Sequence, residues 1–232
     1  KDRKQYIYHP DWINLSAQNK FSKIVDFGLS LPNIRKKVHH DLQTKGLDKR
    51  KIIATVVWLL EHTFIRIGND EYTKENNSYG LTTLLSRHAN VKGSEIVFKF
   101  RGKSGVSHLI KVSNPAIAKT VKRCIELPGY ELFQFIDEDG NRHVVDCADV
   151  NEFLKEVTKD DFSAKDFRTW GATSISAENL YKLGFNKDIR LVKQNIANTV
   201  KKAAKYLNNT ISVCRNYYIH PAVIETYQAN IL

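Results

Sequence analysis

The segment "KRKIIATVVWLLEHTFIRIG", residues 49 to 68, restricts the possible folds of this chain more than any other stretch. Its apolar residues fall on nearly every side of a helix, and Asp48 precedes it as a candidate N-cap. A helix that is apolar all round must be covered by other elements on all sides. The segment therefore predicts a central helix in a fold with a substantial core.

Helical periodicity also marks the segments on both sides of this helix. The first helical stretch begins near Asp11, is expected to break at Pro32, and resumes from Asn33 to Lys45. Later helices are expected at residues 115–127, 148–158, 163–184, 187–207 and 221–229. The helix of residues 187–207 has one apolar face with a spacing of three and four, made by Ile189, Val192, Ile196, Val200, Ala203 and Leu207.

The period changes to that of strands between about residues 80 and 112. "GLTTLL" and "EIVFKF" are β-prone runs, and "EIVFKFRGKSGVSHLIKV" predicts a hairpin with Lys103 at its glycine-flanked turn. "IDEDGNRHVV" predicts a second, weaker hairpin through its Asp-Gly turn. The chain is thus expected to be mainly α-helical with a small antiparallel β-sheet, which is an α+β fold.

Composition narrows the class of partner. The 232 residues include 36 Lys and Arg against 25 Asp and Glu, a net charge of +11. This excess favours a polyanion such as nucleic acid, although a basic protein without such a partner has the same composition. No apolar run reaches the roughly 18 residues of a membrane helix. The three widely spaced cysteines form no metal-ligand pattern and suggest a reducing compartment.

Three basic side chains could carry chemistry, and each has a structural alternative. Arg66, in "FIRIGND" at the end of the apolar helix, needs an anion or a carboxylate partner such as Glu61 or Asp70. Lys103 can reach a ligand from the hairpin turn or stay solvated there. Arg168, in "AKDFRTWGAT", either binds an anion or is a partly buried structural arginine.

Other candidates lie near the end of the chain, in and before "SVCRNYYIHP". Asn209 follows a predicted helix, where asparagine is commonly a cap. Tyr218 is either a nucleophile or an aromatic anchor for the last helix, and its neighbour Tyr217 is expected in packing or toward a DNA backbone. His220 precedes Pro221 and is expected to be a surface residue at a helix start rather than a base.

Four motifs occur in the order "RIGNDEYTKENNSYGLTTL", "FKFRGKSGVSH", "AKDFRTWGAT" and "NNTISVCRNYYIHP". Together they resemble the type IB DNA topoisomerases of bacteria and poxviruses, from about Gln5 to Tyr227. The resemblance implies the catalytic-domain fold that type IB topoisomerases share with tyrosine recombinases. "RKQYIYHP" resembles the join after an N-terminal cap domain, so residues 1–10 are expected to be a linker and residues 11–232 the catalytic domain. The chain begins with Lys and contains no Met, and it is expected to be a fragment that lacks the cap.

The resemblance also implies a reaction. Tyr218 matches the nucleophile that forms a 3′-phosphotyrosyl link with DNA and releases a 5′-hydroxyl, with no cofactor, ATP or metal required. Arg66 and Arg168 match the two arginines that bind the phosphate, and Lys103 matches the general acid. Asn209 stands where poxvirus enzymes carry histidine and bacterial members carry asparagine, which favours a bacterial host over a viral one.

The remaining implications concern the substrate. The expected partner is double-stranded DNA, bound by a monomer without a membrane, in the cytoplasm and associated with the nucleoid. Side chains expected to contact this DNA are Lys165, Tyr72, Gln5, Tyr6 and Tyr8. On an extended chain the tyrosines at 6 and 8 would face one side, although they could be simple linker aromatics.

Two other classes of protein remain possible on these residues. A tyrosine recombinase or integrase shares the arginines, the hairpin lysine and the tyrosine. Its second arginine usually stands in a His-x-x-Arg motif, whereas this chain has Lys165 in "KDFR". A non-enzymatic DNA-binding domain would use the same basic surface. It gives no reason for two arginines, a lysine and a tyrosine in this order.

Overall fold

The computed structural model describes residues 21–232. The predicted linker of residues 1–10, the helix start near Asp11, and the expected DNA contacts Gln5, Tyr6 and Tyr8 lie outside the described residues.

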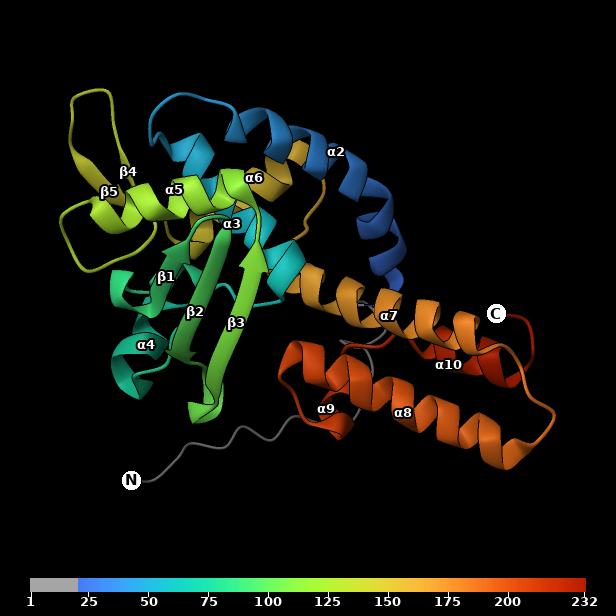
Figure 1. Cartoon of the computed structure of the whole chain (residues 1–232). Helices are drawn as coiled ribbons and strands as arrows, with labels where there is room; N and C mark the ends of the chain where they lie inside the picture. The colour runs from blue at the N-terminus through green and yellow to red at the C-terminus, as the bar shows by residue number, and fades with distance from the viewer. Residues whose placement is uncertain (1–20) are drawn as a thin grey trace.

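The described chain is mainly helical with a small antiparallel sheet, as predicted (Figure 1). Its sheet has the order β1-β2-β3, with strands Ala89–Lys92, Glu95–Arg101 and Ser107–Ser113. A separate hairpin pairs β4 (Gln134–Ile136) with β5 (Arg142–Val144) around the expected Asp-Gly turn. The α-helices are α2 (Ile24–Leu42), α3 (Lys49–Thr63), α4 (Asp70–Asn76), α5 (Pro115–Glu126), α6 (Cys147–Thr158), α7 (Ala164–Leu183), α8 (Ile189–Leu207), α9 (Ile211–Tyr217) and α10 (Pro221–Gln228).

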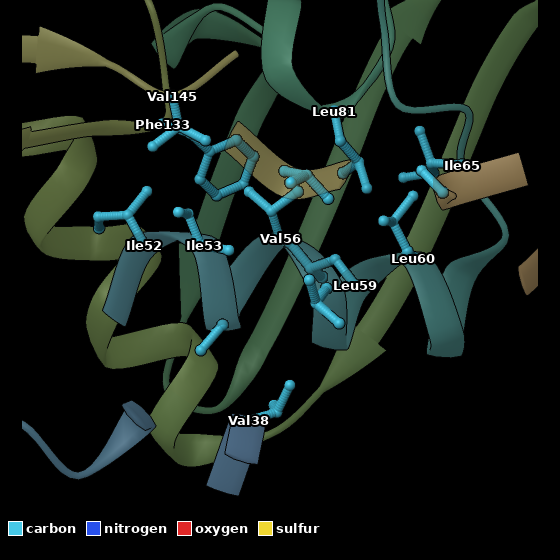
Figure 2. Packing of buried hydrophobic residues seen from close by; sticks show 14 of the residues in the cluster. Val38, Ile52, Ile53, Val56, Leu59, Leu60, Ile65, Leu81, Phe133 and Val145 are labelled. Carbon is cyan, nitrogen blue, oxygen red and sulfur yellow. The ribbon is translucent and has the colours of Figure 1, made fainter. Parts of the chain in front are cut away.

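Helix α3 is central, as its sequence predicts. The Asp48 side chain caps it by accepting from the Lys51 amide at 2.8 Å. The helix packs against α2, α5, α6, α7, β3 and β4. Figure 2 shows its apolar side chains among residues of several other segments, including Phe133 and Val145. The helix ends at Thr63, earlier than expected, because Phe64 adopts a left-handed backbone with φ of 54°.

Helix α2 does not break at Pro32, so that expectation is wrong. The proline ring removes one backbone hydrogen bond, at a cost of about 3 kcal/mol. The helix nevertheless continues because its buried face runs past the proline on both sides, where each buried side chain contributes about 1.5–3 kcal/mol. That face is made by Phe27, Leu31, Ile34 and Val38.

The "GLTTLL" segment also differs from expectation, since it forms a 3₁₀ turn at Leu81–Thr83 and no strand. Its backbone bonds the loop that follows α3: the amides of Leu81 and Thr82 donate to the carbonyls of Arg66 and Ile67 at 2.8 and 2.7 Å. These bonds occupy backbone amides that a β-strand would donate to an adjacent strand. The first strand of the sheet is therefore residues 89–92.

The C-terminal helices differ in smaller ways. Helix α8 buries the predicted face except for Ile189, which is 69% exposed at its first residue. Helices α4 and α9 were not anticipated, because seven residues are too few for a clear helical period.

The buried side chains form two clusters. The larger one unites α2, α3, α5, α6, the first turns of α7 and the sheet, and the smaller one lies among the rest of α7 and α8, α9 and α10. Figure 1 shows where these elements lie. Phe64 and Tyr218 both pack against the smaller cluster. The loop after α3 thus brings residues next to the end of the chain. No helix among residues 21–232 combines the length and apolar character needed to cross a bilayer.

Candidate active site

Arg66 lies in the loop that follows α3, and a neighbouring glycine holds this loop in place. A Cβ on Gly80 would lie 2.6 Å from the Arg66 carbonyl oxygen and equally close to the Gly68 Cα. Only glycine permits this approach of two backbone segments. The "GLTT" turn therefore fixes the backbone from which the Arg66 side chain extends.

The Arg66 side chain bonds an amide rather than a carboxylate. Its Nη2 donates to Asn209 Oδ1 at 2.8 Å. The expected alternative partner Glu61 instead pairs with Arg35 at 2.7 Å. This bond leaves the Asn209 amide nitrogen Nδ2 buried and without a hydrogen-bond partner among residues 21–232. One donor of the pair thus remains available to a ligand.

Arg168, on α7, is held from two directions. Its guanidinium donates to the carbonyl of Phe64 and, at 2.9 Å, to the carbonyl of Leu207. Its side chain is buried, and Nε has no partner within the described part of the chain. Burial, followed by the charge of nearby Arg66, lowers the pKa of Arg168 to about 10, although the charge interaction and hydrogen bond with Tyr218 partly oppose the shift. The group therefore stays positively charged at neutral pH.

The Phe64 carbonyl reaches Arg168 because the backbone turns at the end of α3. The left-handed conformation of Phe64 is uncommon for a bulky residue. Its ring packs against Gly171, where a Cβ would overlap the ring. The glycine in "RTWGAT" thus makes room for the residue that orients Arg168.

Tyr218 lies at the C-terminal end of α9, with its ring centroid 5.2 Å from the Arg168 guanidinium carbon. Its amide donates to Cys214, and its carbonyl accepts from the Thr173 hydroxyl at 3.2 Å. The same hydroxyl accepts from the His220 amide at 3.1 Å. Helix α7 therefore positions the Tyr218 backbone as well as Arg168.

The other candidates in this stretch have different surroundings. Tyr217 has a 46% exposed side chain. His220 is the N-cap of α10, where its Nδ1 accepts from the Ala222 amide at 3.1 Å, and its ring meets the edge of Phe21. Asn209 is not a cap, because Asn208 is the C-cap of α8 and Thr210 is the N-cap of α9.

Lys103 lies on the 3₁₀ turn between β2 and β3 and is exposed. Its Nζ is 6.0 Å from the centroid of the Tyr72 ring. Lys165 is exposed on the first turn of α7, one helical turn before Arg168. The structure therefore joins Arg66 to Asn209 and Arg168 to Tyr218 by direct contacts, and Arg66 is near enough to Arg168 for its charge to lower the Arg168 pKa. Lys103 and Tyr72 are paired at the hairpin turn.

One further residue enters this site without having been anticipated. His108, near the start of β3, is buried, and the Asn208 side chain contacts its Nδ1 at 3.2 Å. Burial lowers the pKa of His108, as do the charges of Arg66 and Arg168. In the sequence this histidine is only one polar residue of an alternating strand, so no local pattern singles it out.

The arrangement suits a phosphate diester. Guanidinium groups bind two oxygens at once and stay charged, and a buried amide can donate to a third position. Such fixed donors stabilise charge that develops on phosphate oxygens during attack. The Tyr218 ring beside Arg168 would put a nucleophilic oxygen next to the bound group.

Comparisons with known proteins agree with this chemistry. Residues 9–232 match the family model of the catalytic core of eukaryotic DNA topoisomerase I. The chain is 31% identical over 237 residues to a DNA topoisomerase 1B of Acanthamoeba polyphaga mimivirus, covering 99% of this chain and 70% of the relative. It is 28% identical over 235 residues to the DNA topoisomerase 1B of Vaccinia virus (strain Copenhagen), covering 97% and 69%.

A fungal relative is also similar over part of its length. DNA topoisomerase 1 of Mycosarcoma maydis is 28% identical over 181 residues, which cover 68% of this chain and 17% of the relative. These relatives are viral and fungal, so they do not favour the bacterial origin expected from Asn209. The family match spans nearly the whole chain, and this chain belongs to the type IB DNA topoisomerases, whose catalytic core it matches.

Proposed function

We propose that this chain relaxes supercoiled duplex DNA by transient cleavage of one strand, with Tyr218 as the nucleophile. The Tyr218 oxygen attacks the phosphorus and forms a 3′-phosphotyrosyl bond, and the bond from phosphorus to the 5′-oxygen breaks. The free strand swivels, and the 5′-hydroxyl then attacks the phosphotyrosine and reseals the strand. The covalent link conserves the bond energy, so no ATP, cofactor or metal is required for resealing.

The observation that carries this proposal is the position of Tyr218 against Arg168, 5.2 Å from ring to guanidinium. Arg66 and Asn209 complete the phosphate site in the proposal. The two donors that are buried and unpartnered among residues 21–232, Arg168 Nε and Asn209 Nδ2, are available for phosphate oxygens. Because arginine and asparagine do not titrate near neutral pH, their role is charge stabilisation and not proton transfer.

Lys103 is the proposed general acid for the 5′-oxygen. The lysine ammonium group carries N–H donors and can supply the proton that the leaving oxygen needs. Its Nζ lies over the Tyr72 ring, 6.0 Å from the ring centroid. Catalytic contacts often tighten only when the substrate binds, so we expect the turn to bring Lys103 to the phosphate in the complex.

The proposed substrate is double-stranded DNA, bound by a monomer through one catalytic domain of residues 11–232. The net charge of +11 supports binding to a phosphate backbone. Lys165, Tyr72, Gln5, Tyr6 and Tyr8 are proposed as contacts that position the duplex. We also propose that the protein acts in the cytoplasm, in keeping with its three free cysteines.

The test combines relaxation of a supercoiled plasmid, in EDTA and without ATP, with trapping of a protein–DNA adduct by denaturant. We expect relaxation and an adduct with the unchanged chain. Tyr218→Phe should abolish both while DNA binding survives, and the matched variant Tyr217→Phe should keep both. An adduct in Tyr218→Phe would move the nucleophile elsewhere. Strand exchange between two duplexes without relaxation would instead indicate a recombinase.

A further inference from the structure

His108 occupies a buried position between two parts of the proposed site. It pairs with Phe100 across β2 and β3, and the two rings stack at 4.8 Å with an angle of 3°. The stack fixes the plane of the imidazole. The histidine side chain is therefore held rigidly beside the turn that carries Lys103.

The turn rests directly on this imidazole. A Cβ on Gly102 would lie 2.5 Å from His108 Nε2, so the backbone just before Lys103 touches the ring. The turn is closed by the Gly102 amide, which donates to the Val106 carbonyl at 2.7 Å. Movement of the His108 ring would consequently move the closed turn and the lysine on it.

The opposite edge of the ring contacts the phosphate site. Asn208 Nδ2 donates to His108 Nδ1 at 3.2 Å. Asn208 ends α8 in a left-handed conformation with φ of 49°. The next residue, Asn209, bonds Arg66. A continuous series of contacts thus runs from the lysine turn through His108 to the residues proposed to hold the phosphate.

The protonation state of His108 agrees with this bridging role. An amide nitrogen can only donate, so Nδ1 accepts and the ring proton lies on Nε2. Burial lowers the His108 pKa, and the charges of Arg66 and Arg168 lower it further. A neutral ring accepts from Asn208 without adding a third cation beside the two arginines.

We propose that His108 is a positioning residue that sets the place of Lys103 relative to the scissile phosphate. This inference rests on the proposed function, and specifically on Lys103 as the acid. Loss of the imidazole removes the support beneath Gly102, so that proton donation to the leaving 5′-oxygen fails. The arginines and Tyr218 remain able to bind and attack the phosphate.

The test compares single-turnover cleavage of two duplexes that differ only in the leaving atom, a 5′-oxygen or a 5′-sulfur. Sulfur leaves without a proton, so it does not need the acid. General acids typically contribute about 10²- to 10⁴-fold, and we expect His108→Ala to lose about 10²-fold or more with oxygen. With sulfur its rate should return to within a few-fold of the unchanged chain.

Two further variants are needed to interpret the rates of His108→Ala. Lys103→Ala should show the same recovery with sulfur, which tests the proposed acid separately. His88→Ala is the matched control, because His88 is also partly buried with a lowered pKa and accepts a backbone amide, that of Leu85. It should keep the ratio of oxygen to sulfur rates of the unchanged chain.

Gly102→Ala provides a second route if His108→Ala does not fold. Its φ of −98° suits alanine, but the new Cβ would push the turn away from the His108 ring. We expect the same selective loss with oxygen. Equal slowing with both leaving atoms, in whichever of the two variants folds, would overturn the positioning role. If the 5′-sulfur also fails to restore the cleavage rate of Lys103→Ala, so that no variant recovers selectively with sulfur, the role of Lys103 as the acid would be overturned as well.

Discussion

Arg66 and Asn209 are 143 positions apart in the sequence, and a hydrogen bond of 2.8 Å joins Arg66 Nη2 to Asn209 Oδ1. The bond links the loop after α3 to the segment between α8 and α9. It orients the Asn209 amide so that its donor remains for a ligand. The two residues therefore act as one phosphate-binding unit in the proposed reaction.

Replacement of Asn209 by alanine tests this unit. Loss of one fixed donor to a developing oxyanion typically lowers the rate by about 10²- to 10³-fold, and we expect a loss in this range for cleavage. The measurement is the single-turnover rate of adduct formation. Asn198→Ala, at an exposed position on α8, is the control and should cleave normally. A normal rate in Asn209→Ala would exclude the amide from the phosphate site.

Arg168→Lys should fail even though the charge is kept. Lysine lacks the planar guanidinium with which Arg168 donates to the Phe64 carbonyl and the Leu207 carbonyl at the same time. A buried acceptor left unpaired costs about 1–3 kcal/mol, so the free energy of unfolding should fall by about this amount. Urea titration measures this loss, and adduct trapping should show cleavage reduced at least as strongly. Arg190→Lys, at an exposed position, should change neither quantity.

Gly171→Ala should disturb Arg168 through its neighbour. The added methyl group would overlap the Phe64 ring and displace the carbonyl that Arg168 bonds. Overpacking of this kind costs about 1–3 kcal/mol of stability, and we expect slower cleavage in addition. Gly28→Ala is the matched control, because its methyl group would overlap the Trp170 ring at the contact of α2 with α7. It should lose stability while adduct formation by the folded fraction stays normal.

The free energy of unfolding should fall as the pH drops through and below the ordinary histidine pKa of about 6.5. The pKa values of His88 and His108 are lowered in the folded chain, in both cases mainly by burial. The unfolded chain therefore binds more protons from about pH 6.5 downward, and the free energy of unfolding decreases until the folded-state pKa values are passed. Above about pH 6.5 these two histidines are mostly neutral in the unfolded chain as well, so they no longer make the free energy of unfolding depend on pH.

Urea titrations between pH 7.5 and 5 provide the measurement. His108→Ala and His88→Ala should each show a shallower decrease than the unchanged chain, and the exposed His39→Ala should follow the unchanged chain. An identical slope in all four proteins would contradict the buried, neutral state of the two histidines.

Local patterns predicted most elements because burial of one face leaves a period in the sequence. The central α3, the β2–β3 hairpin and most of the α8 face follow from such patterns. Pro32 and "GLTTLL" were misread for one common reason. In both places contacts with distant segments outweigh the local preference, through the buried face of α2 and through bonds to the loop after α3.

The sequence by itself determined the family, through four motifs in a fixed order. The same motifs contain the residues that are proposed for catalysis. Only the tertiary structure decided which of them touch. It pairs Arg66 with Asn209, spans Arg168 between two carbonyls, and places His108 under the turn of Lys103. The periodicity of apolar residues in the sequence indicates which side chains are buried, but it does not indicate which residues they contact. Partners of a buried polar group depend on how helices from distant parts of the chain pack together.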